Sequence, residues 1–148
     1  MKNDFNIDNC LGFIANRLVK EFQRSFDEKL SQYNLTCAQF CVLMKLFDGD
    51  GLTQTELADR LYIENPTLVR TLDRLEASGL IERRRSPRDR RAYHVYLRPK
   101  ALELKAIMEK AGEEMNKKAT DGLSPQEVSE VRKRLIFIWQ NLAKRSQL

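Results

Sequence analysis

Residues 53–97 decide the fold, and they read TQTELADRLYIENPTLVRTLDRLEASGLIERRRSPRDRRAYHVYL. The stretch opens with Thr53-Gln54-Thr55-Glu56, a capping-box pattern that predicts the start of a helix over about 53–60. Tyr62-Ile63 is predicted to form a tight turn, and a second helix is expected over about 66–78. Two short helices joined by a tight turn form a helix-turn-helix.

The second helix has its own start and stop signals. Asn65 is expected to cap it, and Pro66 suits its first position, where the N–H that proline lacks is not needed. Three leucines at helical spacing predict its buried face (Leu68, Leu72 and Leu75). Ser78-Gly79 is expected to end it.

A β-hairpin is predicted directly after this helix. Residues 80–84 and 92–97 have strand character, since Tyr93, Val95 and Tyr96 are common in strands. The loop of residues 85–91 between them contains a proline, an aspartate and four arginines. A helix-turn-helix followed by such a hairpin predicts a winged helix-turn-helix.

The positive charge of the chain is concentrated in this hairpin and its flanks. The 148 residues include 26 Lys and Arg and 21 Asp and Glu, a net charge of +5. Residues 80–100 alone hold eight basic and two acidic side chains, so they carry +6 and the remainder −1. Solvated surfaces normally mix both signs. The clustering therefore indicates an anionic partner such as a phosphate backbone.

The predicted helices suit the grooves of DNA. The second helix can enter the major groove while the first braces it across the backbone. The residues expected to contact DNA from this helix are Asn65, Pro66, Thr67, Val69, Arg70 and Arg74. Arg70 is the candidate base reader, because its guanidinium can bond O6 and N7 of guanine. The alternative for Arg70 is a surface salt bridge to Asp73 or Glu76.

Two further groups of residues are candidates for DNA contact. Thr53 and Gln54, at the N-terminus of the first helix, are expected to contact phosphate oxygens. Arginines of the hairpin are expected to enter an A·T-rich minor groove, where the negative potential is focused (Arg84, Arg85, Arg88 and Arg90). Asp89 is expected to hold a neighbouring arginine and preform the hairpin tip.

Apolar residues at helical spacing also fill the two ends of the chain. One stripe runs over residues 7–30, one from Leu97 to Met115, and one from Val128 to Leu142. A capping box at Thr36-Cys37-Ala38-Gln39 begins a helix between the first stripe and the helix-turn-helix, and another at Ser124-Pro125-Gln126-Glu127 begins the last helix. Three long stripes exceed what one small lobe can cover, so a dimer interface is predicted.

The sequence resembles the MarR family of bacterial winged-helix regulators. The motifs that carry the resemblance are Asp73-Arg74-Leu75-Glu76, Leu80-Ile81-Glu82-Arg83 and Asp89-Arg90-Arg91-Ala92, and residues 63–73 look closest to the SlyA-like subgroup. The resemblance implies that Arg70 reads the major groove and Arg90 the minor groove. It also implies that Asp89 and Arg91 shape the wing.

The resemblance implies an assembly as well. It predicts a homodimer joined through terminal helices of about 7–31 and 101–146, with a winged helix-turn-helix lobe of about 36–98 in a single domain of residues 1–148. The expected fold class is mainly α with a small β-hairpin wing. A small aromatic or phenolic effector near the hinge is implied, with no other cofactor and no metal.

The expected function is that of a cytoplasmic, nucleoid-associated transcription regulator, either a repressor or an activator. Its partner would be pseudo-palindromic, A·T-rich double-stranded DNA. Two alternatives stay open: an architectural DNA-binding protein of low sequence specificity, and a winged-helix module for protein–protein interaction. No dinucleotide fingerprint, Walker A run or GxSxG elbow occurs, so an enzyme is not expected.

The remaining reactive side chains are few. Three cysteines without a CxxC motif fit a reducing compartment better than a disulfide scaffold. Cys37 and Cys41 lie four apart on a predicted helix, a poor geometry for a disulfide, and Cys10 lies early on the first helix. All three are expected to be buried, inert thiols. His94, the only histidine, is expected to be structural or to face phosphate.

Overall fold

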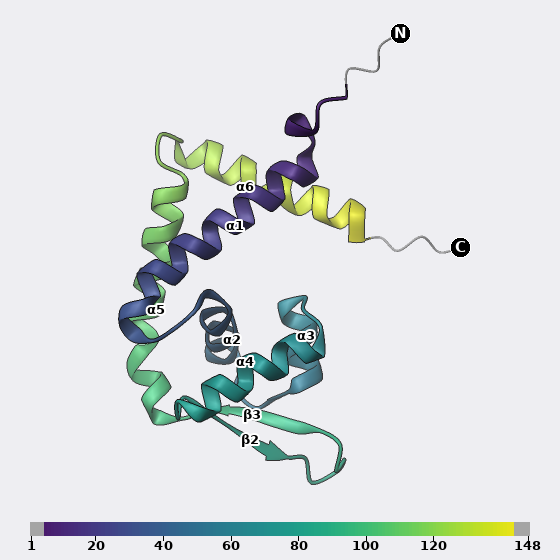
Figure 1. Ribbon diagram of the computed structural model, residues 1–148, viewed down its shortest axis with the longest axis vertical. Helices are drawn as coiled ribbons and strands as arrows, with labels where there is room; N and C mark the ends of the chain where they lie inside the picture. The colour runs from purple at the N-terminus through teal and green to yellow at the C-terminus, as the bar shows by residue number, and fades with distance from the viewer. Residues whose placement is uncertain (1–4, 144–148) are drawn as a thin grey trace, which may run out of the picture. The chain divides into compact units, whose positions relative to one another are not determined.

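The computed structural model describes residues 5–143, which divide after Gly112 into two compact units that are treated separately below. The helices and strands of the first unit (Figure 1) are η1 (Ile7–Asn9), α1 (Leu11–Leu30), η2 (Ser31–Tyr33), α2 (Cys37–Asp48), β1 (Leu52–Thr53), α3 (Gln54–Leu61), α4 (Asn65–Ala77), β2 (Ile81–Arg85), β3 (Tyr93–Leu97) and the first part of α5 (Pro99–Ala119). The second unit holds the end of α5 and α6 (Pro125–Ala143). The fold is therefore mainly α with a small β-sheet.

The first predicted helix is shorter than its apolar stripe. Residues 7–9 form the separate 3-10 turn η1, and α1 begins only at Leu11. Cys10 separates the two with an extended backbone, φ −73° and ψ 122°. The prediction of one continuous helix from residue 7 was therefore wrong. The predicted end of the last helix, near residue 146, lies outside the described residues.

Capping boxes begin three of the helices, as the sequence predicted. In each box the hydroxyl of the N-cap residue accepts a hydrogen bond from the backbone N–H of the residue three positions later. The side chain of that later residue accepts a hydrogen bond in return from the backbone N–H of the N-cap residue. The oxygen–nitrogen distances are 3.3 and 2.9 Å for Thr36 and Gln39, 3.1 and 2.8 Å for Thr53 and Glu56, and 3.2 and 2.7 Å for Ser124 and Glu127. These boxes set the starts of α2, α3 and α6.

Tyr62 forms the turn of the helix-turn-helix. It ends α3 in a left-handed conformation, φ 55° and ψ 38°, and its backbone N–H reaches the carbonyls of Ala58 and Asp59. This geometry is common at helix C-termini, although glycine more often provides it. The predicted turn at residues 62–63 is confirmed, and it sets the direction in which α4 leaves α3.

The sheet has three antiparallel strands in the order β1-β3-β2, one more than the predicted hairpin. β2 and β3 form the hairpin, in which Arg83 lies opposite Val95. The additional strand β1 pairs with the other edge of β3, with Leu52 opposite Val95 and Thr53 opposite His94. The short strand therefore attaches the start of α3 to the hairpin. We call residues 81–97 the wing.

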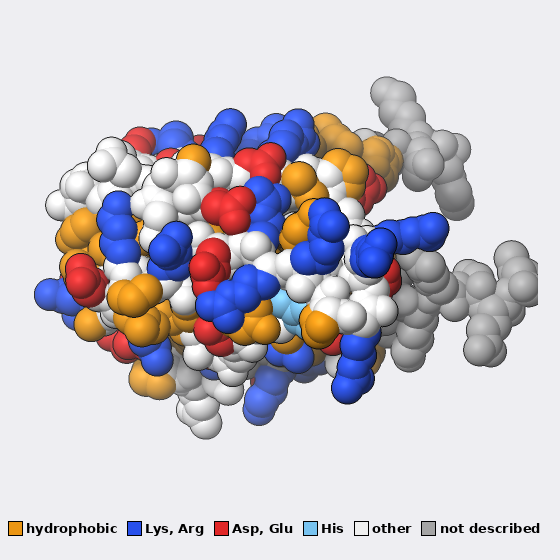
Figure 2. Space-filling view, turned by 90° about the horizontal axis from the view of Figure 1, so that it is seen from below, with side chains coloured by type: hydrophobic (Ala, Val, Ile, Leu, Met, Phe, Trp, Pro, Cys, Tyr) orange, Lys and Arg blue, Asp and Glu red, His pale blue; other side chains and the backbone are white. Residues whose placement is uncertain are grey.

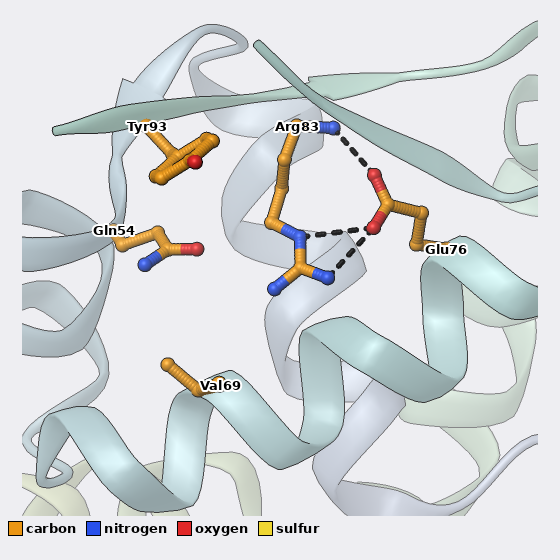
Figure 3. Close-up of a pocket in the computed structure, with 5 residues that line it drawn as sticks. All are labelled: Gln54, Val69, Glu76, Arg83 and Tyr93. Carbon is orange, nitrogen blue, oxygen red and sulfur yellow. Dashed lines mark hydrogen bonds and ion pairs between the residues drawn. The ribbon is translucent and has the colours of Figure 1, made fainter. Parts of the chain in front are cut away.

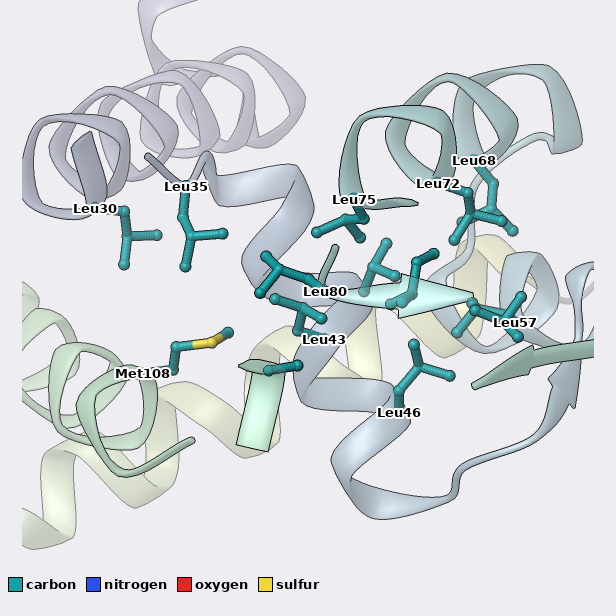
Figure 4. Packing of buried hydrophobic residues seen from close by; sticks show 14 of the residues in the cluster. Leu30, Leu35, Leu43, Leu46, Leu57, Leu68, Leu72, Leu75, Leu80 and Met108 are labelled. Carbon is teal, nitrogen blue, oxygen red and sulfur yellow. The ribbon is translucent and has the colours of Figure 1, made fainter. Parts of the chain in front are cut away.

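Leucine side chains dominate the core of the first unit (Figure 4). Leu43 and Leu46 of α2, Leu57 of α3 and three leucines of α4 are fully buried (Leu68, Leu72 and Leu75). Ala101, Met108 and Ala111 of α5 belong to the same cluster. The apolar stripe of α5, predicted to contribute to a dimer interface, therefore packs into the core of its own chain.

The stripes of α1 and α6 have a different environment. On α1, Leu30 is buried, but Leu11, Ile14 and Leu18 are 65%, 46% and 47% exposed. Five large apolar side chains of α6 are about half exposed, and a sixth, Leu142, is more so (Val131, Leu135, Ile136, Phe137, Trp139 and Leu142). Exposed apolar surface of this extent is typical of an interaction face.

The cysteines are less buried than predicted. Cys41 is exposed, and Cys10 and Cys37 are half-buried. Cys37 is the first residue of α2, and the core-facing positions of that helix are taken by Val42, Leu43 and Leu46. The expectation of buried thiols was therefore wrong: Cys37 and Cys41 lie off the face of α2 that enters the core, and Cys10 lies between η1 and α1.

Candidate nucleic-acid interface

Helix α4 has a buried leucine face and a polar outer face. Five of the six residues predicted to contact DNA from this helix are exposed (Asn65, Pro66, Thr67, Arg70 and Arg74). Val69 is half-buried instead. Asn65 is not the N-cap, because α4 begins at Asn65 itself and Glu64 takes the cap position without a capping side-chain hydrogen bond. The predicted cap at Asn65 was therefore wrong by one residue.

Arg83, a residue that the sequence analysis did not single out, links the wing to α4. Its backbone N–H donates to Oε1 of Glu76 at 2.9 Å, and its Nε donates to Oε2 at 3.1 Å (Figure 3). Its Nη2 lies 2.6 Å from Glu76 Oε2 and 2.7 Å from Asp73 Oδ1. The hydrogen bonds from Arg83 lower the pKa of the Glu76 carboxyl below its ordinary value. Arg83 therefore fixes β2 against α4.

The alternation of side chains along β2 could have revealed from the sequence that Arg83 links the wing to α4. Side chains two apart on a strand share a face, so Arg83 lies on the same face as Ile81, which is fully buried. An arginine on the buried face of a strand needs carboxylate partners. Asp73 and Glu76, three apart on α4, supply them.

The contacts of Arg83 also test whether Arg70 forms a salt bridge on α4. Its two candidate ion-pair partners, Asp73 and Glu76, are both bonded to Arg83. Arg70 is exposed on α4 and forms no ion pair within residues 5–143. The salt-bridge alternative for Arg70 is therefore wrong in this structure, and its guanidinium is available to a partner outside the chain.

Two arginines on β2 are oriented by neighbouring tyrosines. The guanidinium of Arg84 lies 4.4 Å from the ring centre of Tyr96 and also contacts the Glu82 carboxylate. Arg85 lies 5.7 Å from the ring centre of Tyr93, and its Nη2 donates to the Tyr93 hydroxyl at 3.2 Å. Cation–π contacts of this kind hold a charge in place while leaving part of it open to solvent.

The wing tip is shaped by Asp89, although not through an arginine side chain. Its Oδ1 accepts the backbone N–H of Arg91 at 2.9 Å, and its carbonyl accepts the N–H of Ala92 at 3.1 Å. The expectation that Asp89 holds an arginine guanidinium was therefore wrong, since a backbone turn is formed instead. Arg88, Arg90 and Arg91 are exposed around this turn.

Two hollows lie beside these residues. One of about 410 Å³ between α4 and the wing is lined by Gln54, Val69, Glu76, Arg83 and Tyr93 (Figure 3). The other, of about 430 Å³, lies along the wing and is lined by Arg84, Arg85, Ser86, Pro87, Arg88, His94 and Tyr96. Val69 and Gln54, both half-buried, lie on the wall of the first hollow.

His94 and Thr53 have structural partners. Nδ1 of His94 lies 2.9 Å from the carbonyl oxygen of Gly51, which joins the strand β3 to the segment before β1. Thr53 uses both its hydroxyl and its backbone N–H in the capping box of α3. Gln54 side-chain groups point into the first hollow (Figure 3). Of the two predicted phosphate contacts at the start of α3, Gln54 is therefore the one facing a cavity.

Basic side chains spread over the face that contains the wing. Figure 2 shows Lys and Arg across this face, with fewer acidic side chains between them. Among the described residues, no group of three or more His, Cys, Asp or Glu could hold a metal ion. In that same part of the chain, no helix is long and apolar enough to cross a membrane.

Helices α3 and α4, their turn and the three-stranded sheet define a winged helix-turn-helix protein. The chain matches the MarR family over residues 35–93, and it belongs to this family. The HTH-type transcriptional regulator TtmR of Methylorubrum extorquens is 34% identical over 104 residues, 70% of this chain and 53% of the relative. The chain thus spans about half the length of this curated relative.

Solved structures have the same fold over almost the whole chain. A MarR transcriptional regulator from Methanosarcina mazei is 28% identical with a TM-score of 0.84, over 90% of this chain and 96% of that one. A mutant MarR from E. coli, complexed with operator DNA, is 28% identical with a TM-score of 0.82, over 92% of this chain and 98% of that one. The predicted SlyA-like subgroup stays a prediction.

Proposed function

We propose that this protein is a homodimeric, sequence-specific transcription regulator that places α4 in the major groove and the wing in the flanking minor groove. The observation that carries this proposal is Arg70, which is exposed on α4 while Arg83 occupies both nearby carboxylates. A guanidinium held on a helix without an internal partner suits a guanine edge. The E. coli MarR with operator DNA is a relative whose fold this chain shares.

The hollow between α4 and the wing suits the DNA backbone. Adjacent grooves are separated by a phosphate strand, so a protein that enters both must leave space for it. The hollow of about 410 Å³ lies between the two elements, and Gln54 and Arg83 line it. Nη1 of Arg83 has no hydrogen-bond partner within residues 5–143, which leaves it open to a phosphate oxygen.

The wing supplies the second DNA contact. Arg88 and Arg90 are exposed at its tip, and Arg84 and Arg85 are held along it by Tyr96 and Tyr93. Arginine is favoured in narrow A·T-rich minor grooves because the negative potential is strongest there. We therefore infer A·T-rich flanks on each half-site.

Dimerisation is inferred from the apolar faces that the chain leaves open. Leu11, Ile14 and Leu18 on α1, and Leu135 and Phe137 on α6, are each 46–65% exposed. A two-fold axis through such faces would give a pseudo-palindromic site with half-sites about 10 bp apart, one turn of DNA.

A small aromatic effector that changes the spacing of the two α4 helices stays a prediction. Measuring operator affinity during a titration with salicylate tests it.

Selection of binding sites from random DNA tests the proposal against its two alternatives. A specific regulator should enrich a few pseudo-palindromes, whereas an architectural protein should enrich no shared sequence. Arg90→Ala should weaken binding to all sequences and reduce the slope of log affinity against log salt by about one. A protein-interaction module should bind no DNA at moderate salt, and that result would overturn the proposal.

A further inference from the structure

Two thiols lie one helical turn apart at the start of α2, outside the DNA-binding elements. Cys37 is the first residue of the helix and Cys41 lies four residues on, so both side chains occupy the same side. Cys41 is exposed and Cys37 half-buried, so the pair is accessible from solvent.

Hydrogen bonding from the neighbouring Cys37 thiol favours the thiolate form of Cys41. It lowers the pKa of Cys41 to about 7, with help from the charge of Lys45. The same hydrogen bond and burial raise the pKa of Cys37. Near pH 7 the pair therefore presents a thiolate next to a thiol, the arrangement needed for a two-step exchange with an electrophilic centre.

The first turn of α2 holds the pair in place. The backbone N–H of Cys37 donates to Asp27 Oδ1 at 2.7 Å, which ties the helix start to α1. The capping box of Thr36 and Gln39 holds the same turn from the other side. On the inner face of α2, Val42, Leu43 and Leu46 are in the core. A ligand would therefore meet two donors that are already positioned, which lowers the entropic cost of binding.

We propose that Cys37 and Cys41 form a two-thiol site for trivalent arsenic compounds. Thiolates are soft donors and prefer soft centres. Two sulfurs on neighbouring positions of one helix face can take adjacent corners of a pyramidal three-coordinate centre, but they cannot lie on opposite sides of a linear two-coordinate ion. Zinc would need four ligands, and no third His, Cys, Asp or Glu joins the pair among the described residues.

A disulfide between the two cysteines is disfavoured by the helix. Positions four apart on a helix have Cβ atoms about 5–6 Å apart, whereas a disulfide needs about 3.5–4.5 Å. An inserted arsenic atom spans the larger separation. The geometry therefore selects a bridging atom over direct oxidation.

The binding step is an exchange without oxidation or reduction. Counted from the fully protonated pair, the reaction with hydrated phenylarsine oxide, C6H5As(OH)2, breaks two S–H bonds and two As–O bonds and forms two As–S bonds. The two thiol protons leave with the two hydroxyl groups as two molecules of water. The arsenic stays trivalent throughout, so no external oxidant or reductant is needed.

Phenylarsine oxide added to the reduced full-length protein tests the site. Intact mass spectrometry should show one adduct per chain that survives excess 2-mercaptoethanol and is removed by dithiothreitol. Cys37→Ser and Cys41→Ser should each weaken binding by about 10²-fold or more, the advantage of a second tethered donor. Cys10→Ser is the matched control and should keep the adduct.

Three outcomes would overturn the proposal: no monothiol-resistant adduct on the wild type, an adduct that survives in both single variants, or its loss in Cys10→Ser. Thermal unfolding followed by circular dichroism shows whether each variant folds. Should Cys37→Ser unfold, Cys41→Ser decides the result, because the Cys41 side chain is exposed.

Discussion

Two arginines of the winged helix-turn-helix, Arg70 on α4 and Arg83 on the neighbouring strand β2, have different environments. The side chain of Arg83, between α4 and β2, is only 20% exposed and is bonded to both Asp73 and Glu76. Arg70 is exposed on the outer face of the same helix. Both carry one positive charge in one small lobe. We conclude that the positive charge of Arg83 stabilises the packing of β2 on α4, whereas that of Arg70 is open to a partner.

The pairing of Arg83 reduces the part of the positive charge of residues 80–100 that is open to a partner. Arg83 contributes to its +6 but is matched by carboxylates of α4 that lie outside the segment. Arg84 is also paired, with Glu82. The charge open to DNA is therefore carried mainly by the wing tip and by Arg70.

Replacing Arg83 should have the largest effect. Arg83→Ala leaves Glu76 and Asp73 without their partner and detaches β2 from α4. We expect unfolding free energy to fall by about 2–3 kcal/mol, between the values for exposed and buried ion pairs. Urea denaturation measures this change. Arg83→Lys should recover only part of it, because lysine cannot bond both oxygens in the same geometry.

Replacing Arg70 is the matched comparison, since Arg70→Ala removes the same charge. Unfolding free energy should stay within about 0.5 kcal/mol of the wild type, as for other exposed sites. Discrimination at one base pair in each half-site should fall by about 1–2 kcal/mol. Competition binding with single-base variants of the selected site measures it. Equal losses of stability in Arg70→Ala and Arg83→Ala would contradict the comparison.

Lowering the pH should weaken the Arg83–Glu76 contact, with a smaller effect on the free energy of unfolding than the replacement of Arg83. The pKa of Glu76 is lowered in the folded protein from its ordinary value of 4.5. Its contribution to stability is therefore complete above about pH 4.5 and is lost as the pH falls through the lowered pKa. Glu76→Gln removes this contribution at every pH.

The difference in unfolding free energy between the wild type and Glu76→Gln should thus shrink as the pH is lowered below 4.5. Glu56 and Glu127, whose pKa values are also lowered in their capping boxes, titrate in both proteins and cancel from the difference. A difference that stays constant from pH 7 to acid would show that the contact does not depend on the charge of Glu76.

Much of the fold could be predicted because it depends on residues close together in the sequence. Each capping box joins residues three apart, and the turn at Tyr62 joins α3 to α4 directly. Apolar spacing was less decisive. The stripes of α5 and α6 follow the same period, yet Met108 is fully buried and Leu135 is 52% exposed. Spacing identifies an apolar face but does not identify what covers it.

The site could be predicted in part. The exposed positions of Arg70, Arg74, Arg88 and Arg90 follow from helix and hairpin geometry. The bond from Arg83 to Glu76 joins residues seven apart across two elements. Asp89 was predicted to act on a side chain, but in the tip its carboxylate accepts a backbone N–H two residues away. Such contacts depend on tertiary packing and on turn geometry, which apolar periodicity does not report.

The short strand β1 also bears on the order in which the lobe folds. The β2–β3 hairpin closes over a short loop, but the contact of His94 with Gly51 joins residues 43 apart, and that of Leu97 with Asp50 joins residues 47 apart. Closing a longer chain segment costs more entropy before any contact repays it. We expect the hairpin to form early and β1 to join it late, after α3 and α4 have packed, so that amide protons at this edge exchange first when the lobe opens.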